Sequence, residues 1–410
     1  MNQSLSYYLL IDFNASKRFS HHWDYIDKYK SFLENSNVNY EIWIPKNADS
    51  EIFMSLGIQA RGVLRSNVYG YERKHNFSQW IVEKLFNFIL ISLVRKLPKN
   101  FTEIFKHCAS FFYIYKPYNR IKKMQKSHDK ITLVFPTTDS LAIRLLELCL
   151  SKGIMIDGAS LRTIGVESKD GFSVEKVENK FAELINNYPK CNIILGFETM
   201  PYMNILIDNG IPKSRITWAP VPHEKNNNLP KFKNRVFTIG FLGTARPNKG
   251  FESIPSLINA LTSKGIQFHA IAQEAVYPWQ SYSKALNTLL NTFSNIEIIP
   301  ANLSDHQFQK VFSGIDLLVL PYKLENYIVA GSGLLFTAAD LHIPTLAKKG
   351  VAFSWDISEY NLGYLYSDVD EFVKSILHCI KNSDSFEFSR YNSDRNKHFA
   401  NFMQTKSSSP

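Results

Sequence analysis

Two cations lie just after an apolar segment in the second half of the chain. The stretch IGFLGTARPNKGF, residues 239–251, reads as a buried strand, a glycine turn at Gly243, then Arg246 and Lys249. A loop at the carboxyl end of a strand in an open α/β sheet is a common place for ligands. Arg grips a diphosphate in bidentate fashion and Lys acts as a point charge, so the pair could hold a diphosphate. The stretch is neither a P-loop nor a GxGxxG motif, and an exposed turn with ordinary surface cations would read the same way.

A second turn of small residues follows in the same half. Residues 316–347 read as a buried strand, a loop after a proline, and the run Gly331, Ser332 and Gly333 at the start of a helix. Small residues there let backbone N–H groups and the positive end of a helix approach a phosphate. A glycine-rich helix cap chosen for packing is the alternative. Both candidate anion sites would lie on the same carboxyl edge of one sheet.

Candidates for acid–base chemistry lie near strand ends in the first half. Glu167 and Glu198 end two apolar segments, Asp139 follows a third, and His21 and His22 come after the first. A carboxylate or imidazole at such a position could act as general base on an acceptor hydroxyl. Each could equally be a helix cap or a satisfied polar group, and Asp139 is a natural N-cap for the helix that follows it.

The elements that must position these residues alternate between strands and helices. Strand, helix and strand open the chain, and the alternation resumes after a basic helical insertion. A polar stretch with three prolines then has the composition of a linker, and a second alternating series follows it. This pattern predicts an α/β protein with two Rossmann-like, doubly wound domains facing across a cleft.

The expected domain boundaries follow these changes in composition. We expect an N-terminal, acceptor-binding domain at 1–219 with the insertion at about 75–130, and a linker at 220–235. The C-terminal, donor-binding domain should span 236–395, and the rest, 396–410, should be a tail.

Composition limits the class of protein further. The chain has 410 residues, of which 45% are hydrophobic and 14% aromatic, and this favours a folded protein over a disordered one. No apolar run reaches the roughly 20 residues that span a bilayer, so we expect a cytoplasmic protein. The four cysteines are scattered without the spacing of a disulfide framework or a zinc site.

Most of the net charge of +10 lies in one segment. Residues 95–130 carry ten Lys or Arg against two acids, a local charge of +8, beside several aromatic residues. Such a segment suits an anionic membrane surface, where each cation adds about 1 kcal/mol of binding free energy. Docking on the inner face of the cell membrane is therefore one expectation, and a solvated helical face over an ordinary core is the other. No nucleic-acid partner is expected, because no RNP, helix-turn-helix or zinc-finger pattern is present.

The two anion motifs also resemble a known family. Together with SDHQFQKVFSGIDLLVLPY and the helix ending in HIPTLA, they look like the donor domain of GT-B-fold glycosyltransferases of the large retaining group (glycosyltransferase group 1, family 4-like). The resemblance covers about residues 195–380. It implies that Arg246 and Lys249 hold the diphosphate of a nucleotide sugar without a metal or other cofactor. The donor site that it implies comprises Gly243, Thr244, Arg246, Lys249, Tyr322, Glu325, Gly331, Ser332, Gly333 and Thr337.

One departure from the family pattern concerns its two glutamates, eight residues apart. Val329 and Thr337 occupy those positions here. Thr337 can still make one hydrogen bond to a ribose hydroxyl, and Glu325 could reach in from the loop. Glu167 lies about where the family has a sugar-contacting histidine. The departure leaves the donor and the stereochemistry open.

The resemblance implies a glycosyltransferase that moves a sugar from a nucleotide-sugar donor to a precursor of a cell-surface polysaccharide or lipopolysaccharide. A nucleotide-sugar 2-epimerase of the same architecture is one alternative, although it would need a richer set of acids and histidines. A degenerate, non-catalytic GT-B protein that binds a glycan or a partner enzyme is the other.

Overall fold

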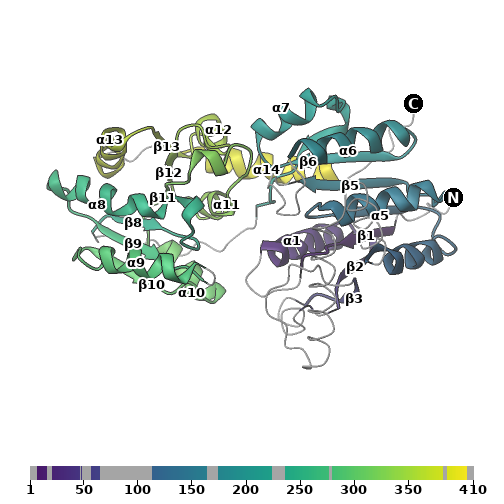
Figure 1. Cartoon of the computed structure of the whole chain (residues 1–410), viewed down its shortest axis with the longest axis horizontal. Coiled ribbons are helices and arrows are strands. Elements are labelled where there is room, and N and C mark those ends of the chain that lie inside the picture. The colour runs from purple at the N-terminus through teal and green to yellow at the C-terminus, as the bar shows by residue number, and fades with distance from the viewer. Residues whose placement is uncertain are drawn as a thin grey trace, which may run out of the picture.

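A computed structural model of the chain describes most of both halves. The described residues are 7–15, 21–46, 48, 57–64, 113–163, 174–223, 236–276, 279–381 and 386–403. They form two parallel sheets with helices packed around them, one in each half of the chain (Figure 1).

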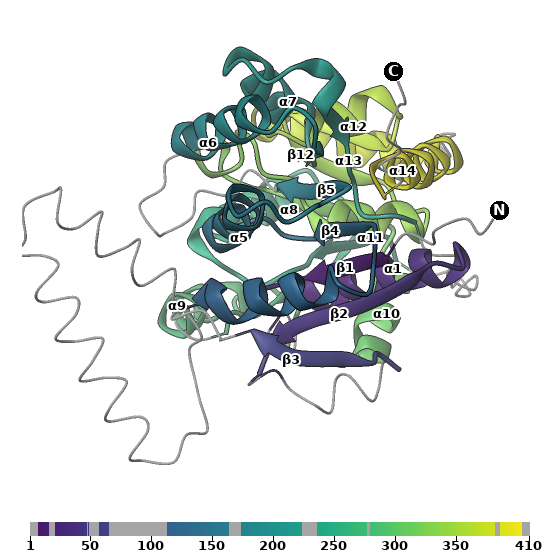
Figure 2. The same ribbon diagram turned by 90° about the vertical axis from the view of Figure 1, so that its right-hand side faces the viewer.

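The N-terminal sheet has seven described strands in the order β3-β2-β1-β4-β5-β6-β7. These are β1 (Tyr7–Ile11), β2 (Asn39–Pro45), β3 (Ala60–Leu64), β4 (Ile131–Phe135), β5 (Gly158–Thr163), β6 (Asn192–Phe197) and β7 (Ile216–Trp218). Its helices include α1 (His21–Asn35), α5 (Ser140–Ser151), α6 (Val174–Asn187) and α7 (Met200–Asp208). Helices α5 and α6 lie on one side of the sheet and α1 on the other (Figure 2). Because both faces are covered, all five residues of the central strand β4 are buried.

The C-terminal sheet has six described strands in the order β10-β9-β8-β11-β12-β13. These are β8 (Thr238–Phe241), β9 (His269–Gln273), β10 (Ile296–Ile299), β11 (Leu317–Leu320), β12 (Thr345–Lys348) and β13 (Gly363–Tyr366). The helices are α8 (Ile254–Ser263), α9 (Gln280–Leu290), α10 (Asp305–Ser313), α11 (Gly333–Asp340), α12 (Ser354–Glu359) and α13 (Val369–Lys381). Strands β9 and β10 lie on one side of β8, and β11, β12 and β13 lie on the other, so the strand order switches between β8 and β11, which are hydrogen-bonded parallel neighbours. The loops that follow these two strands therefore lie side by side, as the predicted donor site requires.

The prediction of two doubly wound α/β domains is confirmed, but individual elements differ. The apolar segment that ends at Glu167 in the sequence corresponds to β5, which begins at Gly158, because the small residues Gly158 to Ser160 also pair with β4 and β6. Strands β3 and β13 were not expected. Residues 164–173 and the linker residues 224–235 lie outside the described part of the chain, so the domain boundaries stay predictions.

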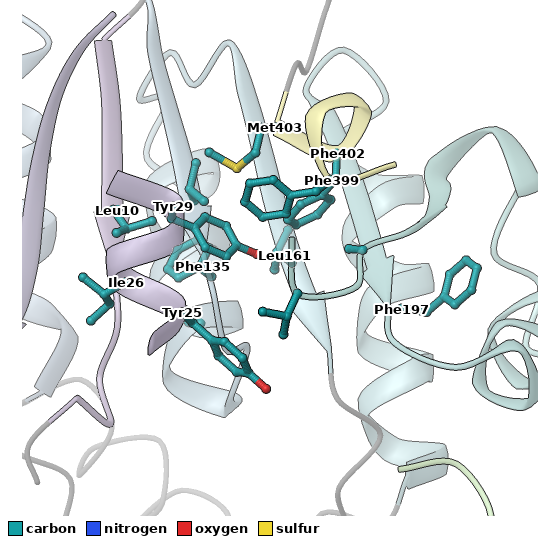
Figure 3. Close-up of a cluster of buried hydrophobic side chains, with 14 of the residues drawn as sticks. Leu10, Tyr25, Ile26, Tyr29, Phe135, Leu161, Phe197, Phe399, Phe402 and Met403 are labelled. Carbon is teal, nitrogen blue, oxygen red and sulfur yellow. The ribbon is translucent and has the colours of Figure 1, made fainter. Parts of the chain in front are cut away.

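The expected tail is wrong over its first residues. Helix α14 (Phe388–Met403) includes 396–403, and it runs from the C-terminal domain back to the N-terminal sheet (Figure 1). Figure 3 shows Phe399, Phe402 and Met403 packed against Tyr29 of α1. The rings of Tyr29 and Phe399 are 4.7 Å apart, and the hydroxyl of Ser160 donates to the carbonyl of Phe402. The helix thus completes the face of the N-terminal sheet that α1 covers.

Only the end of the basic insertion is described. Residues 113–124 are helical, and Arg120 forms an ion pair with Glu41 at 3.1 Å while its guanidinium lies over the ring of Trp43. The lysines from Lys116 to Lys130 are exposed, as is Tyr115. Residues 65–112 lie outside the described part. Within it, no helix is long and apolar enough to cross a bilayer.

Candidate functional site

The glycine turn after β8 is fixed by a side chain of the neighbouring strand. Gly243 has φ +89°, and its N–H donates to Oε1 of Gln273 at 2.8 Å. The amide nitrogen of Gln273 in turn donates to the carbonyl of Ala301. A Cβ on Gly243 would lie 2.8 Å from both Nζ of Lys249 and Cδ1 of Leu334. Gly243 therefore contributes to the site by leaving space for the side chain of Lys249, whereas its N–H is already hydrogen-bonded to Gln273.

The two predicted cations lie together at this turn. Lys249 ends a short 3-10 turn, Pro247–Lys249, and its ammonium is 5.4 Å from the ring centroid of Tyr322. Burial, with a smaller contribution from the positive charge of Arg246, lowers the pKa of Lys249 to about 8. Arg246 is exposed. An anion bound between Arg246 and Lys249 would counter the lowering of the Lys249 pKa by burial and by Arg246, because it favours the charged form of the lysine.

Contacts with the end of β11 hold this cation loop in place. Gly250 has φ +68°, and a Cβ there would collide with the carbonyl oxygen of Pro321. The N–H of Lys323 donates to the carbonyl of Asn248 at 3.2 Å. The loops after β8 and β11 are therefore one packed unit.

The second motif, at the start of α11, adjoins the first. Ser332 is buried, and Tyr322 is close both to it and to the cations, since Ser332 and Arg246 influence the pKa of Tyr322 and Lys249 lies near its ring. Burial raises the pKa of Tyr322 to about 12, against the opposing effects of Ser332 and Arg246. Leu334, in the first turn of α11, touches the Gly243 turn. The structure thus brings both predicted anion motifs into one place.

The N-terminal domain reaches this place through Glu198, which follows β6. Its carboxylate is buried against Gly331, where a Cβ would lie 2.6 Å from Cδ of Glu198. The guanidinium of Arg162 lies 3.3 Å from the same carboxylate and is also buried. Burial raises the pKa of Glu198, and Arg162 opposes that change. A buried carboxylate thus stands where the two domains meet.

A second buried carboxyl, from the C-terminal domain, lies near Glu198. Burial, and next the charge of Glu198, raise the pKa of Asp356 on α12 to about 8. The hydroxyl of Tyr391 donates to Oδ1 of Asp356 at 3.4 Å. Asp356 is therefore mostly protonated at neutral pH.

Helix α11 is anchored at its far end by Arg395 of α14, which is fully buried. Arg395 donates to Asp340 at 2.6 Å and to the backbone carbonyl of Val221, where the chain leaves the N-terminal domain. Asp340 also contacts Nδ1 of His223 at 2.8 Å. Arg395 therefore ties α11 to the chain segment that joins the domains.

Other predicted donor residues lie in the same region with different surroundings. The hydroxyl of Thr337 donates to the carbonyl of Gly333 at 3.2 Å, one turn back in α11. Glu325 is exposed in a 3-10 turn, Leu324–Asn326, and Thr244 is partly buried after the glycine turn. Their roles toward a donor stay predictions.

Of the predicted acid–base residues, the structure describes the side chains of Asp139 and Glu198. Asp139 caps α5, since its carboxylate accepts from the N–H of Ala142 at 2.9 Å and from the side chain of Asn14 at 3.1 Å. Glu167 lies outside the described residues, as do the side chains of His21 and His22 at the start of α1. Of the candidates, Glu198 alone is placed by the described structure beside the donor motifs.

Four residues that position the site were not predicted. Gln273, Arg162, Asp356 and Arg395 are buried polar or charged groups. Arg162 could have been predicted from the sequence to have a partner, because a charged residue inside a buried strand needs one. The others are indistinguishable in sequence from surface residues. Among the described residues, no group of three or more His, Cys, Asp or Glu side chains could hold a metal ion.

Comparisons with known proteins identify the fold. No protein-family profile matches the chain, and no curated protein matches it in sequence. Solved structures do match over nearly the whole length. The lipopolysaccharide outer core galactosyltransferase WaaB, in its apo form, is 12% identical with a TM-score of 0.58, covering 97% of this chain and 98% of its own. Anabaena HepE in complex with UDP-glucose is 12% identical with a TM-score of 0.58, covering 97% of each chain.

A further match is an enzyme of another class. A protein from Listeria monocytogenes, described as a putative UDP-N-acetylglucosamine 2-epimerase, is 10% identical with a TM-score of 0.53, covering 96% of this chain and 91% of its own. The chain therefore has the GT-B fold, two Rossmann-like parallel-sheet domains. At these identities the likeness concerns the fold, and function must be argued from the site.

Proposed function

We propose that the protein is a glycosyltransferase that takes a sugar from a nucleotide-sugar donor and binds the donor's diphosphate without a metal. The observation that carries this proposal is the convergence of Arg246 and Lys249 with the Gly331–Gly333 turn around Tyr322. Two cations and a helix N-terminus at one sheet edge suit two adjacent phosphates. WaaB, by its name a galactosyltransferase, and HepE, which was crystallised with UDP-glucose, lend support to this choice.

The chemistry follows from the charges. Transfer breaks the bond between the anomeric carbon of the sugar and the diphosphate oxygen, and forms a bond from that carbon to an acceptor oxygen. Negative charge grows on the departing diphosphate, where Arg246 and Lys249 would stabilise it. The acceptor hydroxyl gives up its proton to a base, and Glu198 is the described candidate nearest the donor motifs.

A donor screen tests the proposal. Thermal unfolding would be followed with UDP-, GDP-, CMP- and dTDP-linked sugars in turn, because a ligand that binds the folded state raises its unfolding temperature. We expect one base to give a clear rise, and the matching radiolabelled donor to pass its sugar to a lipid-linked or polysaccharide precursor. No rise with any of the four would favour the degenerate, non-catalytic alternative.

The second candidate is a nucleotide-sugar 2-epimerase, favoured by the structural match to the Listeria protein. Incubation with UDP-N-acetylglucosamine distinguishes the two. An epimerase would invert the sugar at C2 without any acceptor, whereas a transferase would leave that carbon unchanged.

We also propose that the acceptor lies at an anionic membrane surface on the cytoplasmic side. Support comes from the exposed lysines Lys116, Lys122, Lys123 and Lys126 beside the exposed ring of Tyr115. Changing the four lysines to Gln should release the protein from vesicles that contain 30% phosphatidylserine, about 1 kcal/mol being lost for each. Undiminished binding would contradict the proposal, and changing exposed lysines on α13 serves as the control.

A further inference from the structure

The turn before α11 is held by the N-terminal domain at two adjacent points. The hydroxyl of Thr199 donates to the carbonyl of Val329 at 2.6 Å. Next to it, the Glu198 side chain lies directly on Gly331. Residues of one domain thus fix the backbone that leads into the candidate phosphate turn of the other.

Glu198 is itself rigidly placed by its own domain. Its carboxylate lies 3.3 Å from Nη2 of Arg162, and its backbone carbonyl accepts from the indole N–H of Trp218 at 3.1 Å. Arg162 also donates to the carbonyl of Ala219 at 2.8 Å. The carboxylate is therefore a fixed surface against which Gly331 packs.

The contact explains the glycine at 331 without reference to a ligand. Gly331 does not have a positive φ, so its backbone conformation is open to alanine. A Cβ there would lie 2.6 Å from Cδ and 2.9 Å from Cγ of Glu198, closer than real atoms come. At Gly333, two residues later, a Cβ would meet no atom within 4 Å, so a substitution there tests the backbone alone.

We propose that Glu198 is a positioning residue for the donor site. By packing on Gly331 it sets how far the Gly331–Gly333 turn stands from Arg246 and Lys249, so the affinity for a diphosphate depends on a side chain of the other domain. The ligand in this inference rests on the proposed function, whereas the contact between Glu198 and Gly331 does not.

The test uses four full-length variants: Gly331→Ala, Glu198→Ala, Gly331→Ala combined with Glu198→Ala, and Gly333→Ala. Calorimetric titration measures the affinity for UDP and for inorganic pyrophosphate, and hydrogen exchange without ligand reports on residues 329–340. We expect Gly331→Ala to weaken binding at least tenfold and to speed exchange in that segment. The double variant should recover both to within about threefold, because the added methyl then occupies the space that Glu198 leaves. Gly333→Ala should leave the exchange unchanged.

Two results would overturn the inference. If Glu198→Ala fails to recover binding in the double variant, Gly331 is needed by the ligand itself. If Gly331→Ala leaves exchange at 329–340 unchanged, the contact does not position the turn. Should wild-type protein bind neither UDP nor pyrophosphate, the proposed function fails, and the exchange measurement still decides the positioning role.

Removal of Glu198 leaves the buried Arg162 without its carboxylate and so could unfold the protein. Glu198→Asp keeps the charge and shortens the side chain by one methylene. Combined with Gly331→Ala, it should recover part of the affinity lost in Gly331→Ala, with thermal unfolding confirming the fold. No recovery in a folded double variant counts against the proposal.

Discussion

At the scale of single residues, the site depends on groups whose charge is set by burial. Lys249 and Asp356 are opposite cases, since burial lowers the pKa of the lysine and raises that of the carboxyl, each to about 8. Both therefore change charge near physiological pH, where surface residues of the same types would not.

The Lys249 ammonium makes anion binding depend on pH. Above its pKa of about 8 the lysine loses its proton and its attraction for a diphosphate. Affinity for a nucleoside diphosphate, measured by titration calorimetry from pH 7 to 9.5, should fall with rising pH by up to tenfold per unit above 8. Lys249→Arg stays charged over this range and should bind with little pH dependence. If affinity depended on pH equally in wild type and in Lys249→Arg, Lys249 would not bind the anion.

Asp356 makes stability fall as pH rises. Its pKa is raised from 3.8 to about 8 in the folded state, so between about pH 4 and 8 the folded protein holds a proton that the unfolded chain has lost. The unfolding equilibrium should shift toward the unfolded state by up to tenfold per pH unit across that window, and level off above it. Chemical denaturation of wild type and Asp356→Asn at several pH values measures the effect. As pH rises, the unfolding free energy of wild type should fall relative to that of the variant. A constant difference would contradict the assignment.

At the scale of elements, the loops after β8 and β11 are placed by topology and α11 by its two ends. The β8–β11 pairing brings the loops together, Glu198 and Thr199 hold the start of α11, and Arg395 holds its end. Of the first relation, βα alternation in the sequence predicts that both loops lie on the carboxyl edge of one sheet, but the strand order that makes β8 and β11 neighbours comes from the structure. The other two depend on contacts between residues far apart in the chain, such as Arg395 with Val221, and no local pattern specifies them.

Helix α14 should be essential to the N-terminal sheet. Phe402 is fully buried, and its ring lies against the backbone of Gly196 on β6. Phe402→Ala should lower the free energy of unfolding by about 3–5 kcal/mol, because it leaves a cavity between α14 and the sheet. Lys397→Ala on the exposed side of the same helix is the matched control and should change stability by less than about 0.5 kcal/mol. Similar unfolding midpoints in urea for the two variants would refute this role.

At the scale of the whole molecule, sequence patterns predicted two Rossmann-like domains but not how they are joined. Strict alternation of apolar strands and amphipathic helices carries the fold class, because both faces of a parallel sheet must be covered. The sequence patterns did not predict helix α14, because its apolar residues are separated by many polar ones. Of the site, the cations and glycines could be predicted from their place after strands. Gln273, Asp356 and the Glu198–Gly331 contact could not, because each is defined by a neighbour in another part of the chain.

The central claim is that Arg246 and Lys249 hold the diphosphate of a nucleotide sugar. It is tested most directly by titrating the nucleoside diphosphate identified in the donor screen against wild type and Arg246→Ala. A charge-assisted hydrogen bond to phosphate contributes about 1.5–3 kcal/mol, so the variant should bind about 10- to 150-fold more weakly and lose the thermal stabilisation that the ligand gives wild type. Unchanged affinity and stabilisation in Arg246→Ala would contradict the claim.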